Sequence, residues 1–330
     1  MTRFLASRLA QATIVLLAVS LIVFVLLSQT GDPVLQMLGP HSTQEQRDEL
    51  RERLGLDRPI HVQYGRYLVS AVQGDLGNSL HINKPALGLI LDRMPATLEL
   101  AFAAMLFAGG LAFPLGILAA LRPRGALART ILTGSLLGIS MPTFVTGILF
   151  MWIFAVIPNL HDVGWLPRMP ALGRGQTTMV FGYRTGLLTL DGLLHIVLPA
   201  MTLGLYYLAV LTRLIRTEMI EELSQDFVRT ARSKGLGEAL VVVKHALRNA
   251  LIPVVTVMGL QLGGLIAFSI VTETIYQWPG MGKFLIESIG KGDRPVVLAY
   301  LLLVAVIFVT LNLAVDILYA VIDPRVRVSA

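Results

Sequence analysis

Six long runs of residues without a charged side chain dominate this sequence of 330 residues. They cover residues 9–28, 100–121, 130–160, 192–212, 249–272 and 295–315. Each run is long enough to cross about 30 Å of hydrocarbon, because a helix rises about 1.5 Å per residue. A soluble protein with this sequence would need nearly every helix to be apolar on all sides. The runs therefore predict an all-α, polytopic membrane protein with six transmembrane helices.

The composition agrees with this prediction, since only 15% of the residues are charged and the mean hydropathy is +0.70. The first run follows Arg3 and Arg8, as the apolar part of a signal peptide would. It is longer than the apolar part of a typical signal peptide, and the sequence SQTGDPV after it has no A-x-A cleavage site. We therefore expect a retained first helix. The sequence has no cysteine, which excludes disulfides and thiol-based metal sites or catalysis.

The distribution of lysine and arginine predicts the orientation of the helices, because short cytoplasmic segments are rich in both. With the N-terminus inside, fourteen basic residues fall in short cytoplasmic segments, and seven of these lie from Arg213 to Arg248. The two shorter outer loops, at about 161–191 and 273–294, hold three each. We therefore expect both termini in the cytoplasm. The net charge of +6 then reflects this bias and the anionic inner leaflet, not nucleic acid.

The segment between the first two runs contains signals for short helices of its own. Ser42 and Glu45 have the spacing of a capping box, and the charged run after them ends at Gly55. A second helix is expected to begin at Pro59 and to stop before Gly74. Its apolar face carries Ile60, Tyr64, Tyr67, Leu68 and Ala71. Such a face is typical of a helix that lies on a membrane or on neighbouring helices.

We predict four successive regions along the chain. They are the N-terminal segment with the first helix over residues 1–28, an extracytoplasmic segment with short helices over 29–99, a core domain of five transmembrane helices over 100–322 that contains a cytoplasmic loop at about 213–248, and a cytoplasmic tail over 323–330.

Part of the cytoplasmic loop, SQDFVRTARSKGLGEALVVVKHALRNALIP at residues 224–253, has the signals of a short helix. Asp226 near its start and Lys234 near its end complement the helix dipole. Gly235 suits a left-handed C-cap, and Leu236 follows as an exposed apolar residue. The next helix is expected to open near Glu238 and to continue into the fifth transmembrane helix.

The short helix is predicted to be amphipathic. One face, with residues three or four apart, consists of Asp226, Arg229 and Arg232 or Ser233. Another face consists of Phe227, Val228 and Ala231. A helix with two such faces is suited to docking a cytosolic partner. From the residues alone, a solvated loop with many positive charges remains the alternative.

Residues 226–236 and 245–256 resemble, without gaps, a pattern of the dipeptide/oligopeptide permease family of binding-protein-dependent ABC importers. That pattern is D-Y/F-V/I-R-T-A-R-A-K-G-L followed by H-A-L-R-N-A-x-x-P-V-V-T, and Ser233 stands here where alanine is usual. Further motifs look like the B-type subunit of that family, in order along nearly the whole chain. They are GDPV (31–34), LGLDRPIHVQY (54–64), GDLGNSL (74–80), PATLEL (95–100), ETIYQWPGMGKFL (273–285) and DPRVR (323–327). Arg229 and Thr230 depart from the wider importer pattern, which has Glu-Ala there.

The resemblance implies a type I ABC importer permease fold in the bacterial inner membrane, and a translocation pathway for di- or oligopeptides or similar small solutes. The implied partners are a second, C-type permease subunit, two ATP-binding subunits that hold ATP and Mg²⁺, an extracytoplasmic substrate-binding protein and membrane lipid. The implied ATPase-docking residues of this coupling helix are Asp226, Phe227, Val228, Arg229, Ala231, Arg232, Lys234, Gly235 and Leu236.

The stretch WPGMG is implied to belong to the outer vestibule, through Trp278, Pro279, Gly280 and Gly282. A tryptophan-anchored turn at the membrane interface is the plainer interpretation of the same residues.

The chain lacks the sequence of an ATP-binding site. A P-loop needs G-x-x-x-x-G-K-S/T, and the nearest string, QWPGMGKF, has Gln277 and Phe284 at two required positions. There is also no H-E-x-x-H and no G-x-S-x-G, so we expect no catalytic site, no metal and no cofactor in this chain.

A secondary transporter or channel that is not driven by ATP is the alternative function. Such proteins usually carry ionisable groups in the middle of their spans. Glu99, Glu273 and Asp316 lie near predicted span ends, where interfacial placement or bonds between helices would explain them. His195 is expected to be a hydrogen-bonded packing residue. Only the energy source of transport separates the two functions.

Overall fold

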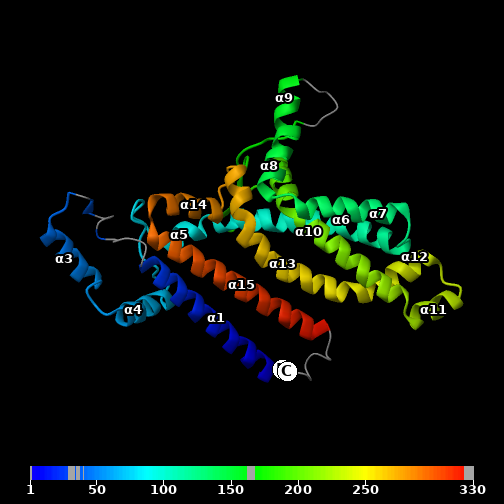
Figure 1. Ribbon diagram of the computed structural model, residues 1–330, viewed down its shortest axis with the longest axis horizontal. Helices are drawn as coiled ribbons and strands as arrows, with labels where there is room; N and C mark the ends of the chain where they lie inside the picture. Colours follow the sequence, from blue (N-terminus) through cyan, green and yellow to red (C-terminus); the bar gives the residue numbers. More distant parts are fainter. Residues whose placement is uncertain (1, 29–33, 35–37, 40, 162–167, 323–330) are drawn as a thin grey trace. The chain divides into compact units, whose positions relative to one another are not determined.

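The structure is a computed structural model that describes residues 2–28, 34, 38–39, 41–161 and 168–322 (Figure 1). The motif GDPV, except for Val34, and the tail 323–330 with its DPRVR motif lie outside the described residues. The chain forms two compact units, Met1–Met94 with Lys283–Val309, and Pro95–Gly282 with Thr310–Ala330. The four-region division predicted from the sequence concerns membrane topology and stays a prediction.

The first unit is helical. Its elements are α1 (Thr2–Ser28), α3 (Gln44–Leu54), α4 (Ile60–Val72), α5 (Ala86–Leu91), most of α14 (Met281–Lys291) and the first part of α15 (Arg294–Ile322). The rings of Tyr64 and Tyr67 on α4 lie 5.4 and 5.5 Å from the ring of Phe24 on α1. The hydroxyls of Ser20 and Tyr64 are hydrogen-bonded at 2.8 Å. The two tyrosines of the predicted apolar face of α4 therefore pack on a neighbouring helix.

The capping box of α3 lies one residue later than predicted. The hydroxyl of Thr43, not Ser42, accepts a hydrogen bond from the Gln46 amide at 3.3 Å, and the Gln46 side chain accepts one from the Thr43 amide at 3.0 Å. Ser42 instead donates to the carbonyl of Gly39 and accepts from Arg47. A glutamine can complete a capping box as glutamate does, which makes the two registers alike in sequence. The predicted end at Gly55, with φ of 66°, is confirmed.

The second unit carries most of the remaining helices. Its elements are α6 (Met94–Leu121), α7 (Ala126–Ser140), α8 (Thr143–Met151), a π-helical turn η1 (Trp152–Val156), α9 (Ile157–His161), β1 (Thr178–Val180), β2 (Tyr183–Thr185), α10 (Leu190–Leu223), α11 (Asp226–Ser233), α12 (Glu238–Leu240), a second π-helical turn η2 (Val241–Ala246) and α13 (Leu247–Ile275).

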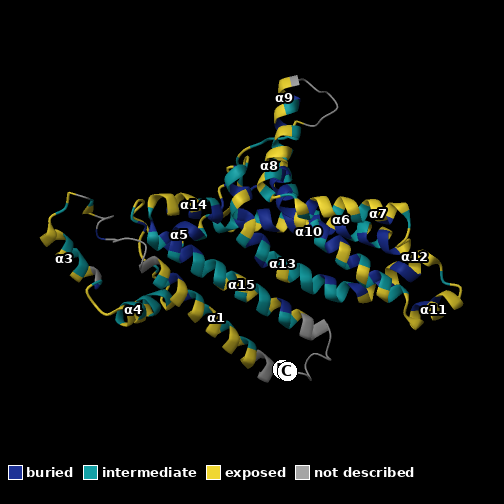
Figure 2. Cartoon of the chain, in the orientation of Figure 1, coloured by how far each residue is buried: buried dark blue, intermediate teal, exposed yellow. Residues whose placement is uncertain are grey.

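Helix α10 is central to the second unit and packs against α7, α8 and α13. Buried positions run along α6 and α10, shown in dark blue in Figure 2. Small residues permit this packing. A Cβ added at Gly204 would lie 2.7 Å from the carbonyl oxygen of Ala104, and one added at Gly116 would lie 2.7 Å from the side chain of Ile215. The close approach of α6 and α10 therefore depends on these glycines.

Among the described residues, six helical segments are long and apolar enough to cross a membrane, as predicted. They are Ala6–Leu26, Ala86–Leu121, Thr143–Leu160, Leu190–Leu223, Glu238–Ile275 and Arg294–Leu318. The predicted run 130–160 is wrong as a single helix, because α7 ends at Ser140 and α8 begins at Thr143. Pro142 causes this break, since proline forces the residue before it out of the helical region, and Met141 is extended with ψ of 126°.

Candidate functional site

Helix α11 lies between α10 and α12, at one end of the second unit (Figure 1). It has eight residues, and its last turn is closed by Gly235 in the left-handed region with φ of 77°. The Gly235 amide donates to the carbonyl of Arg232 at 2.9 Å, and the Leu236 amide donates to the carbonyl of Ala231 at 3.4 Å. This pair of bonds is the Schellman motif. The predicted helix and its glycine C-cap are thus confirmed by the geometry.

The inner face of α11 packs on its own chain. Val228 and Ala231 are buried and form a small apolar cluster with Val241 of η2, and Leu236 packs against this cluster. The prediction that Leu236 is exposed is wrong, because the Schellman turn brings its side chain back over the helix. Val228, Ala231 and Leu236 therefore fix the position of α11 and leave little surface for a partner.

The outer face of α11 is polar, with one aromatic ring. Phe227 is 39% exposed, although the sequence grouped it with Val228 and Ala231. Asp226 and Arg229 are exposed and form an ion pair with an N–O distance of 3.4 Å. Arg232 forms an ion pair of 2.6 Å with Glu238 across the turn, and this hydrogen bond raises the pKa of Arg232 above its usual value. An exposed aromatic ring beside charged side chains is suited to contact with another protein.

The chain after α11 continues as one helical segment through α12, η2 and α13, as predicted from Glu238 onward. The π-helical turn over Val241–Ala246 was not predicted. Such turns are rare and occur often at functional sites. The turn lies beside α11, since Val241 belongs to the apolar cluster beneath that helix.

The motif WPGMG is mostly buried. Trp278 has no exposed surface, and its indole nitrogen donates to the carbonyl of Ala96 on α6 at 2.8 Å. Gly280 and Gly282 are also buried, and Pro279 is exposed. In the second unit, Trp278 therefore acts as a packing residue between α6 and the loop after α13. Its assignment to an outer vestibule stays a prediction, for which Pro279 offers the exposed surface.

The two glycines of this motif surround the carboxylate of Glu273, which is fully buried. The hydroxyl of Thr97 donates to Glu273 at 2.6 Å and that of Ser269 donates at 3.0 Å. The Met281 amide in turn donates to the Thr97 oxygen at 2.8 Å. A Cβ added at Gly280 would lie 2.4 Å from the Glu273 carboxylate. Glu273 of α13 is thus bonded to Thr97 of α6, and a bond between helices is one of the two explanations expected for a charged residue near the end of a span.

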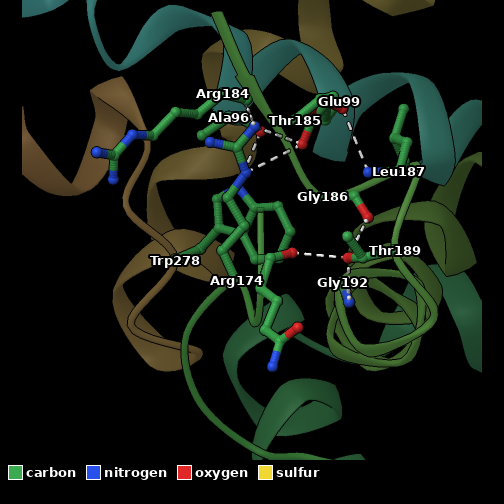
Figure 3. A network of polar contacts seen from close by, with 11 residues as sticks. Ala96, Glu99, Arg174, Arg184, Thr185, Gly186, Leu187, Thr189, Gly192 and Trp278 are labelled. Atoms are coloured by element: carbon green, nitrogen blue, oxygen red, sulfur yellow. Dashed lines mark hydrogen bonds and ion pairs between the residues drawn. The ribbon is translucent and has the colours of Figure 1, made fainter. Parts of the chain in front are cut away.

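A second polar network holds the loop before α10 (Figure 3). Arg174 pairs with Glu99 of α6 at 2.6 Å, and both side chains are only 10% exposed. The Arg174 guanidinium also donates to the Arg184 carbonyl at 2.7 Å and lies 5.9 Å from the ring centre of Trp278. Thr189 caps α10 through the Gly192 amide, at 3.0 Å. This loop is consequently tied to α6 and to α10.

The same loop contains a β-hairpin that was not predicted. Strands β1 and β2 pair antiparallel, with Val180 opposite Tyr183. Phe181 and Gly182 form the turn, with φ of 48° and 84°. Phe181 is 98% exposed, and Met179 and Tyr183 beside it are also exposed. The sequence signal was TMVFGYRT, in which residues that favour strands flank a glycine-containing turn.

His195 is hydrogen-bonded within its own helix, in agreement with its predicted role as a packing residue. Its Nδ1 lies 2.8 Å from the backbone carbonyl oxygen of Asp191, one turn earlier on α10. Asp316 on α15 is partly buried. Among the described residues, no group of three or more histidine, aspartate or glutamate side chains is placed to hold a metal ion.

Comparison with known proteins gives consistent similarities. The family described as "Binding-protein-dependent transport system inner membrane component" matches residues 112–328, and its N-terminal family matches residues 1–101. The sequence is 42% identical to the di/tripeptide transport system permease protein DppB of Pseudomonas aeruginosa, over 99% of both chains. It is 38% identical to the glutathione transport system permease protein GsiC of Salmonella paratyphi A, again over 99% of both.

A chain from the structure of the MetNI methionine ABC transporter in inward-facing conformations has a similar fold. The TM-score is 0.54 at 18% identity, over 73% of this chain and 100% of that chain.

Proposed function

This chain belongs to the family of inner membrane components of binding-protein-dependent transport systems, and on that premise we propose that it forms half of the translocation pathway of an ATP-driven peptide importer. The proposed substrates are di- or oligopeptides, or small peptide-like solutes such as glutathione. The names of relatives that match nearly the full length support this class. The chain is a membrane translocation subunit and not itself an enzyme.

We propose that α11 is the coupling helix on which an ATPase subunit docks. The observation that carries this proposal is the division of its surface into two faces. Val228 and Ala231 fix the helix to the chain, so that a push on the exposed face moves α10 and α13 with it. The exposed face then contacts the ATPase through Phe227 and the charged residues Asp226 and Arg229.

The remaining components follow from this arrangement. Two ATP-binding subunits hold ATP and Mg²⁺, because the chain has no P-loop of its own. A second, C-type permease subunit forms the other half of the pathway, and an extracytoplasmic protein delivers the substrate. The exposed apolar hairpin tip at Phe181 and the exposed Pro279 are the proposed contacts with that protein.

Both chain termini are proposed to lie in the cytoplasm, on the side of α11. The chain has no cysteine, so single cysteines report the topology directly. In cells with a permeable outer membrane and an intact inner membrane, Gln44→Cys and Gln176→Cys are expected to react with an impermeant thiol reagent. Ser233→Cys is expected to stay unlabelled, and its labelling would reverse the orientation.

The docking proposal is tested with the complex reconstituted in proteoliposomes. Phe227→Ala is expected to reduce both the capture of the ATPase subunits and peptide-stimulated ATP hydrolysis, since it removes exposed apolar contact surface. Thr230→Ala is the control, because Thr230 lies on the same helix and its hydroxyl donates to the Asp226 carbonyl of that helix. Equal coupling in both variants would refute the assignment of Phe227.

The alternative function, transport without ATP, is tested in vesicles that contain the membrane subunits but no ATPase. Peptide uptake is expected to be absent in these vesicles and to appear when the ATPase subunits and ATP are added. Uptake that persists without ATPase subunits would identify a secondary transporter or channel.

A further inference from the structure

A basic pocket of about 520 Å³ lies beside α11, within the second unit. Its lining residues are Phe227 of α11, Lys244 and His245 of η2, and Arg248, Asn249 and Ile252 of α13. In the sequence, these basic residues are recognisable only as part of the positive charge of the loop. The structure brings them together around one hollow.

The charges of this pocket are not neutralised by its lining. Lys244 and Arg248 are exposed, and neither side chain forms a hydrogen bond or ion pair within the part of the chain that the structure describes. The carboxylate of Glu222 lies close to the pocket, where it accepts a hydrogen bond from the Asn249 side chain at 3.1 Å. None of the described residues that line the pocket is acidic. The hollow therefore presents two unpaired cations to an anion.

The position of the pocket along the chain favours a membrane lipid over a soluble anion. Arg248 and Ile252 lie in the first turns of α13, within the candidate span Glu238–Ile275. Leu240 and Val243, which precede the lining residues Lys244 and His245 in the sequence, are 45% and 62% exposed. Exposed apolar residues beside basic ones are typical of a segment at the membrane surface, where the apolar side chains enter the bilayer and the charges meet phosphates.

We propose that this pocket binds the phosphate of an anionic membrane lipid. Lys244 and Arg248 donate to the phosphate oxygens, and both Phe227 and Ile252 offer apolar surface to the glycerol and the first acyl carbons. Because Phe227 belongs to α11 and also lines the pocket, a bound lipid contacts the same ring that is proposed to contact the ATPase. The lipid site thus adjoins the docking surface.

The test uses the purified full-length chain in neutral detergent, titrated with phosphatidylglycerol or phosphatidylcholine and read by native mass spectrometry. The wild type is expected to bind phosphatidylglycerol in preference to phosphatidylcholine. Lys244→Gln combined with Arg248→Gln is expected to weaken phosphatidylglycerol binding about thirtyfold, which is about 2 kcal/mol at about 1.4 kcal/mol per tenfold change.

Two further double variants make the test specific. Arg122→Gln with Arg124→Gln removes the same charge from an exposed connection between α6 and α7, and is expected to bind as the wild type does. Lys244→Arg with Arg248→Lys keeps both charges in the pocket and is expected to retain most of the binding. Binding retained in this variant would show that the glutamine variant loses lipid because it has lost charge and not because it is unfolded.

Four outcomes would overturn the proposal. The pocket is not a lipid site if both glutamine double variants bind phosphatidylglycerol equally, or if phosphatidylcholine binds as well as phosphatidylglycerol does. The proposal also fails if the pocket variant keeps its lipid but loses the ATPase subunits in pull-down, because the pocket would then accept an acidic group of that partner. Displacement of the lipid by inorganic phosphate at equal concentration would assign the site to a soluble anion instead. Loss of lipid binding with intact ATPase capture would leave the docking proposal standing.

Discussion

Helix α11 and the loop over residues 168–189 are both connections in the second unit, yet they use their polar residues in opposite ways. In α11 the charged residues are exposed, and a small apolar cluster around Val228 holds the helix in place. In the loop the ion pair of Arg174 and Glu99 is almost buried, and the apolar side chain of Phe181 is exposed. One connection is therefore anchored by apolar packing and presents charged side chains, while the other is anchored by polar bonds and presents an aromatic ring.

This difference has consequences for how each region responds to substitution. Removing one partner of a buried ion pair leaves an uncompensated charge, which is costly. Removing a residue from the surface of α11 or from the hairpin tip removes only contacts that a partner would make. Substitutions of the anchoring residues should therefore change the stability of the chain, and substitutions of the exposed residues should change its association with partners.

The largest effect is expected for Arg174→Ala, which leaves Glu99 buried without its cation. The free energy of unfolding is expected to fall by about 3–5 kcal/mol. Thermal unfolding of the purified chain in detergent, followed by near-ultraviolet circular dichroism, measures the loss. The control is Arg184→Ala, since the Arg184 side chain is exposed and only its backbone carbonyl meets Arg174. Equal melting temperatures would mean that the ion pair does not anchor the loop.

A smaller loss is expected for Gly280→Ala, because the new Cβ would lie 2.4 Å from the Glu273 carboxylate. Overpacking of this kind costs about 1–3 kcal/mol. Gly290→Ala in α14 is the matched control, since nothing lies within 4 Å of a Cβ added there. The same thermal measurement compares the two variants. If both have the same melting temperature, Gly280 is not needed to make room for Glu273.

Gly235→Val is expected to disturb α11 by about 1 kcal/mol or more, since a β-branched residue resists the left-handed region. The control is Gly237→Val, because Gly237 is extended with φ of −62° and has open space around it. Hydrogen exchange of residues 226–236 should rise in the first variant only, and ATPase capture should fall with it. If Gly235→Val changes neither hydrogen exchange nor ATPase capture, the Schellman turn does not position the docking face.

The smallest effect on the chain itself is expected for Phe181→Ser at the hairpin tip, whose side chain is 98% exposed. The free energy of unfolding should change by no more than about 0.5 kcal/mol. Stimulation of ATP hydrolysis by the extracytoplasmic binding protein should nevertheless decrease. If the binding protein still stimulates ATP hydrolysis fully in the reconstituted complex, the hairpin tip does not contribute to the proposed contact with that protein.

The amino-acid sequence by itself determined the six apolar segments, the family and the existence of α11 with its glycine cap. These features are local or repetitive, because hydrophobic runs, caps and ordered motifs are read from neighbouring residues. The break at Pro142 is also a local feature. The prediction of one run over 130–160 was wrong because Pro142 ends the preceding helix even inside a long apolar run.

Only the tertiary structure decided which residues face inward. A helical period separates two faces of α11 but does not say which one a neighbour covers. In the structure, Val228 is buried in a cluster with Val241, and Phe227 is exposed. The partner of Arg174 is Glu99, 75 residues away in the sequence. The buried Trp278 is hydrogen-bonded to Ala96, which is 182 residues away. Contacts over such separations depend on how the helices pack, which no local pattern of residues records.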